Sequence, residues 1–358
     1  MQSTLSLDLH SQMSAFPNAQ RTELEKRGLN IQTDIPVVDA VTITESVAVS
    51  FGDGTVRFFR PGLAYTTVEA HKGVILSMVA DTGGVLTGGD DGRFLRITQD
   101  GAIEEIYKFD SKWVDCVASS KNYSACSSGN SAYVWDELHS RPTRLEHPST
   151  IGGLAFDAKG RRLAVAHYGG ATIWEKHKNR WKSSRLVWNG SHNQITFSPD
   201  GKFIVTAMQE NALHGWRVRD KANLAMSGYP AKIKSFDWVK GTPFLVTSGA
   251  HEAVCWPFDG KFGPMERKPV CVASNNNELV TCVTALPGDD ALFAGFRDGS
   301  VLAAEVSESK GVIPIRKATG SEITAMAVSA CNTHIFIGDA KGNILWTRLV
   351  GYKDDWNV

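Results

Sequence analysis

Short apolar runs alternate with short polar turns along almost the whole chain, from about residue 37 to residue 349. The stretch 151–188 shows the pattern well, with the runs IGGLAF, RRLAVAH, ATIWEK and SRLVW and the connections DAKG and YGG. Val, Ile, Phe and Trp in such runs, with Gly, Asp, Asn and Pro between them, are typical of strands joined by tight turns. The pattern therefore predicts four strands in this stretch and an all-β chain.

One short segment departs from this pattern. The sequence RTELEKRG (21–28) has Thr22 three residues before Glu25, the spacing of a capping box at the start of a helix. We predict a short helix there. Residues 1–28 are otherwise polar, and we interpret them as an N-terminal extension that precedes a single domain over 29–358.

The strand pattern repeats along the chain. Each repeat ends its third predicted strand at a bulky or apolar residue, and eight such positions follow one another at steps of 38 to 48 residues: Phe59, Ile97, Trp135, Trp174, Trp216, Trp256, Ala304 and Trp346. We number the repeats from one to eight in this order. A period near 40 residues with four strands per repeat is that of a β-propeller blade.

The repeat also limits how the sheets can be arranged. A single four-stranded sheet cannot bury both its faces, whereas sheets stacked radially around an axis cover one another. We predict eight blades, with seven as the alternative if one repeat is lost or displaced. The last repeat lacks a fourth strand, and we expect LNIQTDIP (29–36) to supply it and to close the ring.

Several motifs give these repeats a family resemblance. SPDGK, the strand endings VW, IW, CW and LW, and turns such as DDGRF and GDGTV resemble WD40 repeats over roughly residues 37 to 349. The stretches 153–174 and 198–216 resemble a group of bacterial WD40 proteins of undefined function. The resemblance implies a WD40-like propeller, a fold that commonly serves protein–protein interaction.

The resemblance also implies a structural polar set in each blade, made of a His, a Ser or Thr, an Asp and a Trp. Each buried member needs a hydrogen-bond partner, so a complete set makes the blade rigid. No repeat keeps all four residues. The members that can be identified are His71, Thr87 and Asp91 in repeat two, His147 with Trp174 in repeat four, and Thr206 with Trp216 in repeat five. In repeat five Glu210 replaces the Asp, and Trp188 lies near the His position.

Composition excludes several classes of function. Lys plus Arg and Asp plus Glu both number 38, and this neutral charge argues against a general nucleic-acid or membrane binder. The basic run HKNRWKSSR (177–185) is interpreted as a solvated loop. The six cysteines form no C-x-x-C pair, so we expect them to be reduced and to bind no metal. No signal peptide or membrane span is apparent, and we expect a cytoplasmic protein.

The resemblance places the turn after each second strand on one face, beside the central channel. Repeats four to seven carry polar and aromatic residues there, of types that suit protein recognition. The candidate partner-binding residues are His167, Tyr168, His192, Asn193, Gln209, Glu210, Asn211, His251, Glu252, Phe296 and Arg297.

The leading hypothesis is a non-enzymatic propeller that binds another protein, is monomeric on its own and needs no cofactor or metal. The sequence has no G-x-S-x-G, Walker A or H-E-x-x-H motif. The alternative is a propeller that binds a small ligand or a metal at the channel mouth, or an enzyme that uses a pair such as His251 and Glu252 as acid and base.

Overall fold

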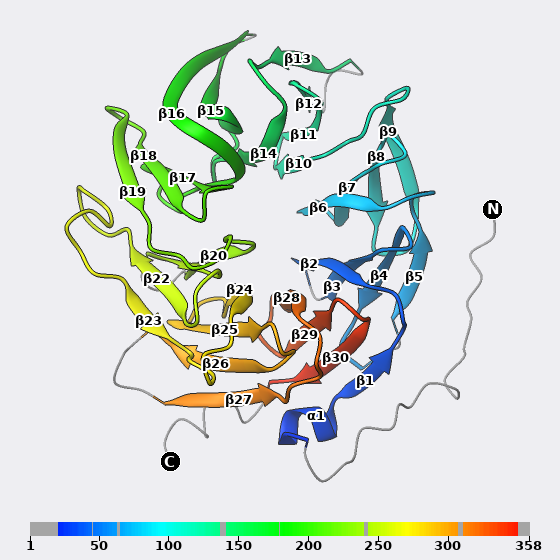
Figure 1. Ribbon diagram of the computed structural model, residues 1–358. Helices are drawn as coiled ribbons and strands as arrows, with labels where there is room; N and C mark the ends of the chain where they lie inside the picture. The colour runs from blue at the N-terminus through cyan, green and yellow to red at the C-terminus, as the bar shows by residue number, and fades with distance from the viewer. Residues whose placement is uncertain are drawn as a thin grey trace.

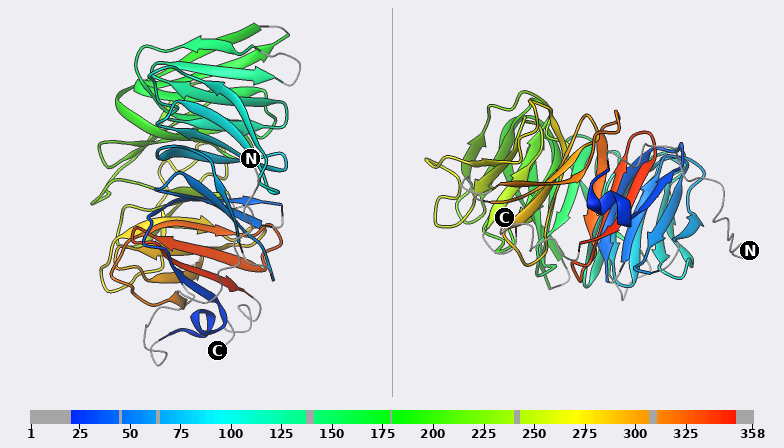
Figure 2. Two further views of the ribbon diagram at one scale, coloured as in Figure 1. Left: turned by 90° about the vertical axis from the view of Figure 1, so that its right-hand side faces the viewer. Right: turned by 90° about the horizontal axis from the view of Figure 1, so that it is seen from below.

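The strands form a ring of antiparallel sheets around a central axis (Figure 1). The computed structural model describes residues 21–349 except 45, 63–64, 137–140, 179, 240–242 and 307–310. Among these residues seven sheets make up the ring, and in five of them four strands follow chain order from the axis to the rim. The exceptions are the six-stranded sheet of repeats four and five and the last sheet, whose outer strand comes from the start of the described chain. Seen from the side, the strands of each sheet run across the thickness of the ring, from one face to the other (Figure 2). The protein is therefore an all-β β-propeller.

The first three repeats each form one four-stranded sheet. Repeat one contains β2 (Val37–Ile43), β3 (Ser46–Phe51), β4 (Thr55–Phe59) and β5 (Thr66–Glu69). Repeat two contains β6 (Ile75–Asp81), β7 (Gly84–Gly89), β8 (Arg93–Thr98) and β9 (Ile103–Lys108). Repeat three contains β10 (Val117–Ser120), β11 (Tyr123–Ser128), β12 (Ser131–Asp136) and β13 (Thr143–Glu146).

The remaining repeats form four sheets. Repeats four and five contain β14 (Ile151–Phe156), β15 (Arg162–His177), β16 (Arg180–Phe197), β17 (Phe203–Met208), β18 (Leu213–Arg217) and β19 (Ala222–Met226). Repeat six contains β20 (Phe236–Val239), β21 (Phe244–Thr247), β22 (Ala253–Pro257) and β23 (Val270–Val272). Repeat seven contains β24 (Val280–Ala285), β25 (Ala291–Phe296), β26 (Val301–Glu305) and β27 (Val312–Arg316). Repeat eight contains β28 (Ile323–Val328), β29 (His334–Asp339) and β30 (Asn343–Arg348), joined by β1 (Leu29–Gln32).

The number of sheets is seven, the alternative that the sequence offered, and not eight. All eight repeats fold into strands, but repeats four and five share one sheet. The reason is β16, which runs unbroken from the rim of repeat four to the axis of repeat five. Its first half pairs with β15, as in Leu186 opposite Ala171, and its second half pairs with β17, as in Ile195 opposite Thr206. Counted by separate sheets, the propeller has seven blades.

The N-terminal segment joins the last sheet. Strand β1 pairs antiparallel with β30, with Ile31 opposite Ile344, so residues 29–32 are the outer strand of repeat eight. Helix α1 (Glu23–Arg27) precedes it and begins with the capping box of Thr22 and Glu25. The Leu24 side chain is buried in the core of repeats seven and eight, and the Thr347 hydroxyl donates to the Leu24 carbonyl at 2.8 Å. The described part of the predicted extension, 21–28, is thus packed against the propeller, and residues 1–20 lie outside the described residues.

The core lies between neighbouring sheets. Every position of β3, β7, β17 and β25 is buried, because each of these second strands is covered on both faces. The contact between the first and last sheets is typical: the rings of Phe59 and Phe336 lie 4.8 Å apart. This packing explains why runs such as FIVTAM are continuously apolar rather than alternating.

The six cysteines are free, as the sequence predicts. Among the described residues, no helix has the length and apolar character needed to cross a membrane.

The β1–β30 pairing generates a prediction about stability. Ile31 packs against the core between the first and last sheets, so Ile31→Asp places a charge against apolar surface and should lower the free energy of unfolding by about 2 kcal/mol. The exposed Asp34 has a φ of 55°, which Asn tolerates, so Asp34→Asn is the control and should change stability by less than about 0.5 kcal/mol. Urea unfolding followed by fluorescence measures both. Equal effects of the two substitutions would show that β1 does not stabilise the ring.

Candidate functional site

One face of the ring carries the loops that lead into the innermost strands together with the turns between second and third strands. We call it the entry face. Backbone hydrogen bonds link the two kinds of segment in successive repeats: Asp90 N–H to the Val74 carbonyl at 3.1 Å, Gln209 N–H to Ser191 at 2.9 Å, and Arg297 N–H to Leu279 at 2.9 Å. All the predicted partner-binding residues belong to these segments, so the topology places them at one face.

Eight of the eleven predicted residues reach the surface of the entry face. Tyr168 is the most prominent, with 67% of its surface exposed. Gln209, Glu210 and Arg297 are also exposed, and Asn193, Asn211, His251 and Glu252 are partly exposed. The other three, His167, His192 and Phe296, are buried. Their side chains cannot contact a partner in this conformation, so assigning them to the binding face was wrong.

The buried three have structural roles. The His167 ring is held between the Thr172 hydroxyl at 2.9 Å and the Tyr168 carbonyl at 3.0 Å. The His192 Nδ1 lies 2.7 Å from the Thr206 hydroxyl. His192 therefore supplies the histidine of the polar set in repeat five, a position that the sequence left unfilled. Phe296 belongs to the apolar core between repeats six and seven.

The predicted polar set of repeat two is fully hydrogen-bonded. His71 Nδ1 lies 2.9 Å from the Asp91 carboxylate, and its Nε2 lies 2.9 Å from the Thr87 hydroxyl. In repeat four the Trp174 indole N–H donates to His147 Nε2 at 2.9 Å.

Repeat six has an equivalent set that sequence reasoning missed. The Tyr229 hydroxyl lies 2.6 Å from the Thr247 hydroxyl and accepts the Trp256 indole N–H at 2.6 Å. Burial raises the pKa of Tyr229 to about 12, so the hydroxyl stays protonated. Tyrosine thus takes the place of histidine. Trp256 and Thr247 at the expected spacing were the available signal.

Glu210 keeps part of the role of the aspartate that it replaces. Its carboxylate accepts the Ser191 N–H at 3.2 Å, as the Asp91 carboxylate accepts the Lys72 N–H at 3.1 Å. Its neighbour Gln209 accepts from the Lys232 ammonium at 2.8 Å. Repeats five and six are therefore tied together at the entry face by side chains that remain accessible to a partner.

Exposed apolar side chains lie on the same face, mostly outside the predicted set. Trp113, in the loop before β10, is 60% exposed, and Val187, within β16, is 64% exposed. Both were missed because a single apolar residue gives no periodic signal that it is exposed. We call the group the apolar arc, and its members are Val74, Trp113, Tyr168, Val187 and Trp188.

Hydrogen bonds between successive loops show that the arc follows neighbouring repeats. The Trp113 carbonyl accepts from Ser128 at 2.9 Å, and the next turn residue, Gly129, accepts from the Ile151 N–H at 3.0 Å. The Tyr168 N–H then donates to the Ser149 hydroxyl at 3.0 Å. Val187 lies opposite Gly170 in the β15–β16 pairing, close to Tyr168. The arc therefore spans repeats two to five, whereas the sequence placed the binding residues in repeats four to seven.

A cavity of about 420 Å³ lies where the innermost strands converge. Asp39, Asp237, Cys282 and Thr324 are among its lining residues. Burial raises the pKa of the Asp39 carboxyl to about 7, and the Ala40 N–H at 2.8 Å offsets only part of this effect. In the described part of the chain, no group of three or more His, Cys, Asp or Glu side chains is arranged to hold a metal ion.

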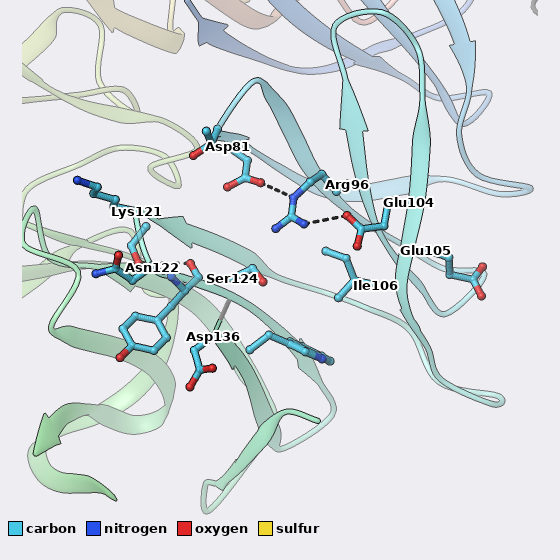
Figure 3. Close-up of a pocket in the computed structure, with 13 residues that line it drawn as sticks. Asp81, Arg96, Glu104, Glu105, Ile106, Lys121, Asn122, Ser124 and Asp136 are labelled. Carbon is cyan, nitrogen blue, oxygen red and sulfur yellow. Dashed lines mark hydrogen bonds and ion pairs between the residues drawn. The ribbon is translucent and has the colours of Figure 1, made fainter. Parts of the chain in front are cut away.

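A larger groove of about 610 Å³ lies between the sheets of repeats two and three (Figure 3). Its charged groups are largely paired with one another. The Arg96 guanidinium donates to Asp81 at 2.7 Å and to Glu104 at 2.8 Å, and Glu105 and Asp136 add further negative charge to the wall. Apart from Lys121, which forms no ion pair with a described carboxylate, the groove therefore offers little to an anionic ligand, and the sequence predicted none of its residues as a site.

The Tyr229 set yields a prediction. Tyr229→Phe removes the acceptor of the buried Trp256 N–H and should lower the free energy of unfolding by about 1–3 kcal/mol. Tyr168→Phe loses a tyrosine hydroxyl at an exposed position, and its free energy of unfolding should stay within about 0.5 kcal/mol of the wild-type value. Chemical denaturation compares the two. If both variants are as stable as the wild type, the Tyr229 hydroxyl has no structural role.

His147 yields a prediction about pH. Burial, followed by the nearby His167, lowers its pKa to about 4. An unfolded histidine titrates near 6.5. The contribution of the neutral, buried His147 to stability is therefore complete above that pH and is lost as pH falls from about 6.5 to about 4. His147→Gln keeps an acceptor for Trp174 but cannot be protonated, so the stability advantage of the wild type over this variant should shrink by about 1–3 kcal/mol over that range. Thermal unfolding of both proteins across this pH range tests it, since the other titrating groups are common to both. A difference between them that does not change with pH would contradict the assignment.

Comparison with known proteins shows the fold alone. No protein-family model matches the chain, and no curated protein matches it either. Two similar solved structures are the computationally designed Ika8 protein, with a TM-score of 0.71 over 88% of this chain and 97% of that one, and U3-55K, with a TM-score of 0.56 over 77% and 95%. Each is 14% identical in sequence to this chain. At that identity the likeness establishes the β-propeller architecture and no activity.

Proposed function

We propose that the chain is a WD40-like propeller that binds another protein through its entry face. The apolar arc carries this proposal. Large apolar side chains exposed to water are unfavourable unless something covers them, and grouped aromatic residues are typical anchors of protein interfaces. Trp113 and Tyr168, 60% and 67% exposed, are the anchors. The WD40 character is supported by the hydrogen-bonded set of His71, Thr87 and Asp91 and by its counterparts in repeats four to six.

The scaffold supports binding by keeping these side chains in place. The Trp188 ring stacks on the buried His214 at a centroid distance of 3.9 Å, so its exposed edge is already fixed. A surface that is ordered before binding loses less conformational entropy when a partner docks. On this proposal the chain is a monomer in the cytoplasm until it meets its partner, and it uses no cofactor, membrane or catalytic chemistry.

The axial cavity favours a second candidate, a propeller that binds a small ligand. Asp39 faces a space of about 420 Å³ with a carboxyl that is half protonated near neutral pH. A carboxyl poised in this way could bind a polar or cationic small molecule. Here the ligand would lie at the axis, away from Trp113 and Tyr168.

Pull-down with the full chain as bait distinguishes the candidates. We expect one stoichiometric partner, retained at least tenfold less by the double variant Trp113→Ser/Tyr168→Ser. The matched control Phe262→Ser/Val312→Ser removes two exposed apolar side chains away from the entry face and should retain the partner. Equal retention by both double variants would contradict the proposal. A small molecule that co-purifies with the wild type and is lost in Asp39→Asn would favour the second candidate.

A further inference from the structure

The opposite face of the ring gathers cations from three separate parts of the chain. We call it the exit face, because the innermost strands end there in turns that lead to the second strands. Six exposed basic side chains lie on or beside its turns in repeats three and four: Lys121, Lys159, Arg161, Lys178, Arg180 and Lys182. We call these six residues the basic cluster. Only the last three belong to the basic run in the sequence.

Contacts between the turns show that these segments are neighbours. A Cβ on Gly160, between Lys159 and Arg161, would lie 3.1 Å from the Ser120 side chain, next to Lys121. The Lys176 N–H donates to the Arg161 carbonyl at 3.1 Å, which places the end of the β15–β16 hairpin beside the same turn. The cluster is therefore continuous across two repeats.

These cations have no counter-ion within the described part of the protein. None of the six forms an ion pair with a described carboxylate. The nearby carboxylates have other partners: Asp157 accepts from the Arg162 guanidinium at 2.8 Å, and Glu175, which lies opposite Lys182, is 3.2 Å from His177. The chain is neutral overall. The local excess of positive charge therefore arises because folding brings these cations together from separate parts of the chain.

Aromatic rings lie beside the cluster. Trp181 is partly exposed and meets the Tyr123 ring edge-on at 5.4 Å. The Lys176 ammonium lies over both rings, 5.3 Å from Trp181 and 5.8 Å from Tyr123. Rings interleaved with cations are the combination that binds single-stranded nucleic acid, since cations follow the phosphates and rings stack on bases.

We propose that the basic cluster binds single-stranded nucleic acid through its phosphate backbone, with the partly exposed Trp181 ring beside the cations to stack on a base. An acidic protein segment would satisfy the cations but would make no use of the rings. The neighbouring groove (Figure 3) contains the carboxylates Asp81 and Glu104 with Arg96 paired between them, so it adds no free cation of its own and bounds the cluster on that side. The neutral net charge argues only against binding over the whole surface, and this site is local.

Fluorescence anisotropy with a labelled 20-nucleotide oligouridine tests the proposal with the full chain. Binding at low salt should weaken at least tenfold in the variant Lys159→Ala/Arg161→Ala/Arg180→Ala/Lys182→Ala. Each lost phosphate contact lowers the slope of log affinity against log salt by about 0.7, so the slope should fall by about 3. The control Lys72→Ala/Lys112→Ala/Lys317→Ala/Lys341→Ala removes the same charge from exposed residues of the entry-face segments and should bind like the wild type.

Three results would overturn the proposal: no binding by the wild type at low salt, an equal loss in both quadruple variants, or displacement of the oligonucleotide by an equal charge of polyglutamate. The last would identify the partner as an acidic protein segment instead. Thermal unfolding of each variant confirms that it is folded, which is expected because all eight side chains are exposed.

Discussion

Mutual covering of the sheets is the constraint on which the rest of this structure depends. A four-stranded sheet that is apolar on both faces, as β3, β7, β17 and β25 require, is stable only between two neighbours. The ring satisfies this condition for every sheet, including the last, where β1 completes the strands of repeat eight. Because packing between neighbouring sheets holds the strands in place, the loops at both faces do not have to contribute to the core. They can therefore serve recognition.

Buried polar sets add rigidity to this packing, and their chemistry varies while their geometry is kept. Repeat two uses His71, repeat five uses His192, and repeat six uses Tyr229, each with a threonine on the second strand of its repeat. A buried threonine hydroxyl needs a partner, and either an imidazole or a phenol meets that need. The repeats can therefore differ in sequence at this position while keeping the same hydrogen bond to the threonine.

The two faces differ in character. The entry face presents grouped apolar side chains in repeats two to five, with polar residues in the later repeats, while the exit face of repeats three and four presents cations that pair with no described carboxylate. Apolar groups and charges select partners by different forces, one by removal of water and the other by salt-dependent attraction. The two proposed surfaces can therefore be occupied and tested independently, with the rigid ring fixing the distance between them.

The sequence by itself determined the strand repeat, the all-β fold, the short capped helix and the polar set of repeat two. These features rest on contacts within a repeat, and such contacts leave a local pattern. Only the tertiary structure decided that His167, His192 and Phe296 are buried, that Trp113 and Tyr168 share a face, and that the basic cluster is continuous. It also merged repeats four and five, where a Cβ on Gly190 would lie only 2.5 Å from the Met208 side chain and 3.1 Å from the Glu210 carboxylate, so glycine is needed at this point of β16. Several of these outcomes depend on residues far apart in sequence, such as Ser120 beside Gly160, and no periodicity within one repeat records which side chains meet there.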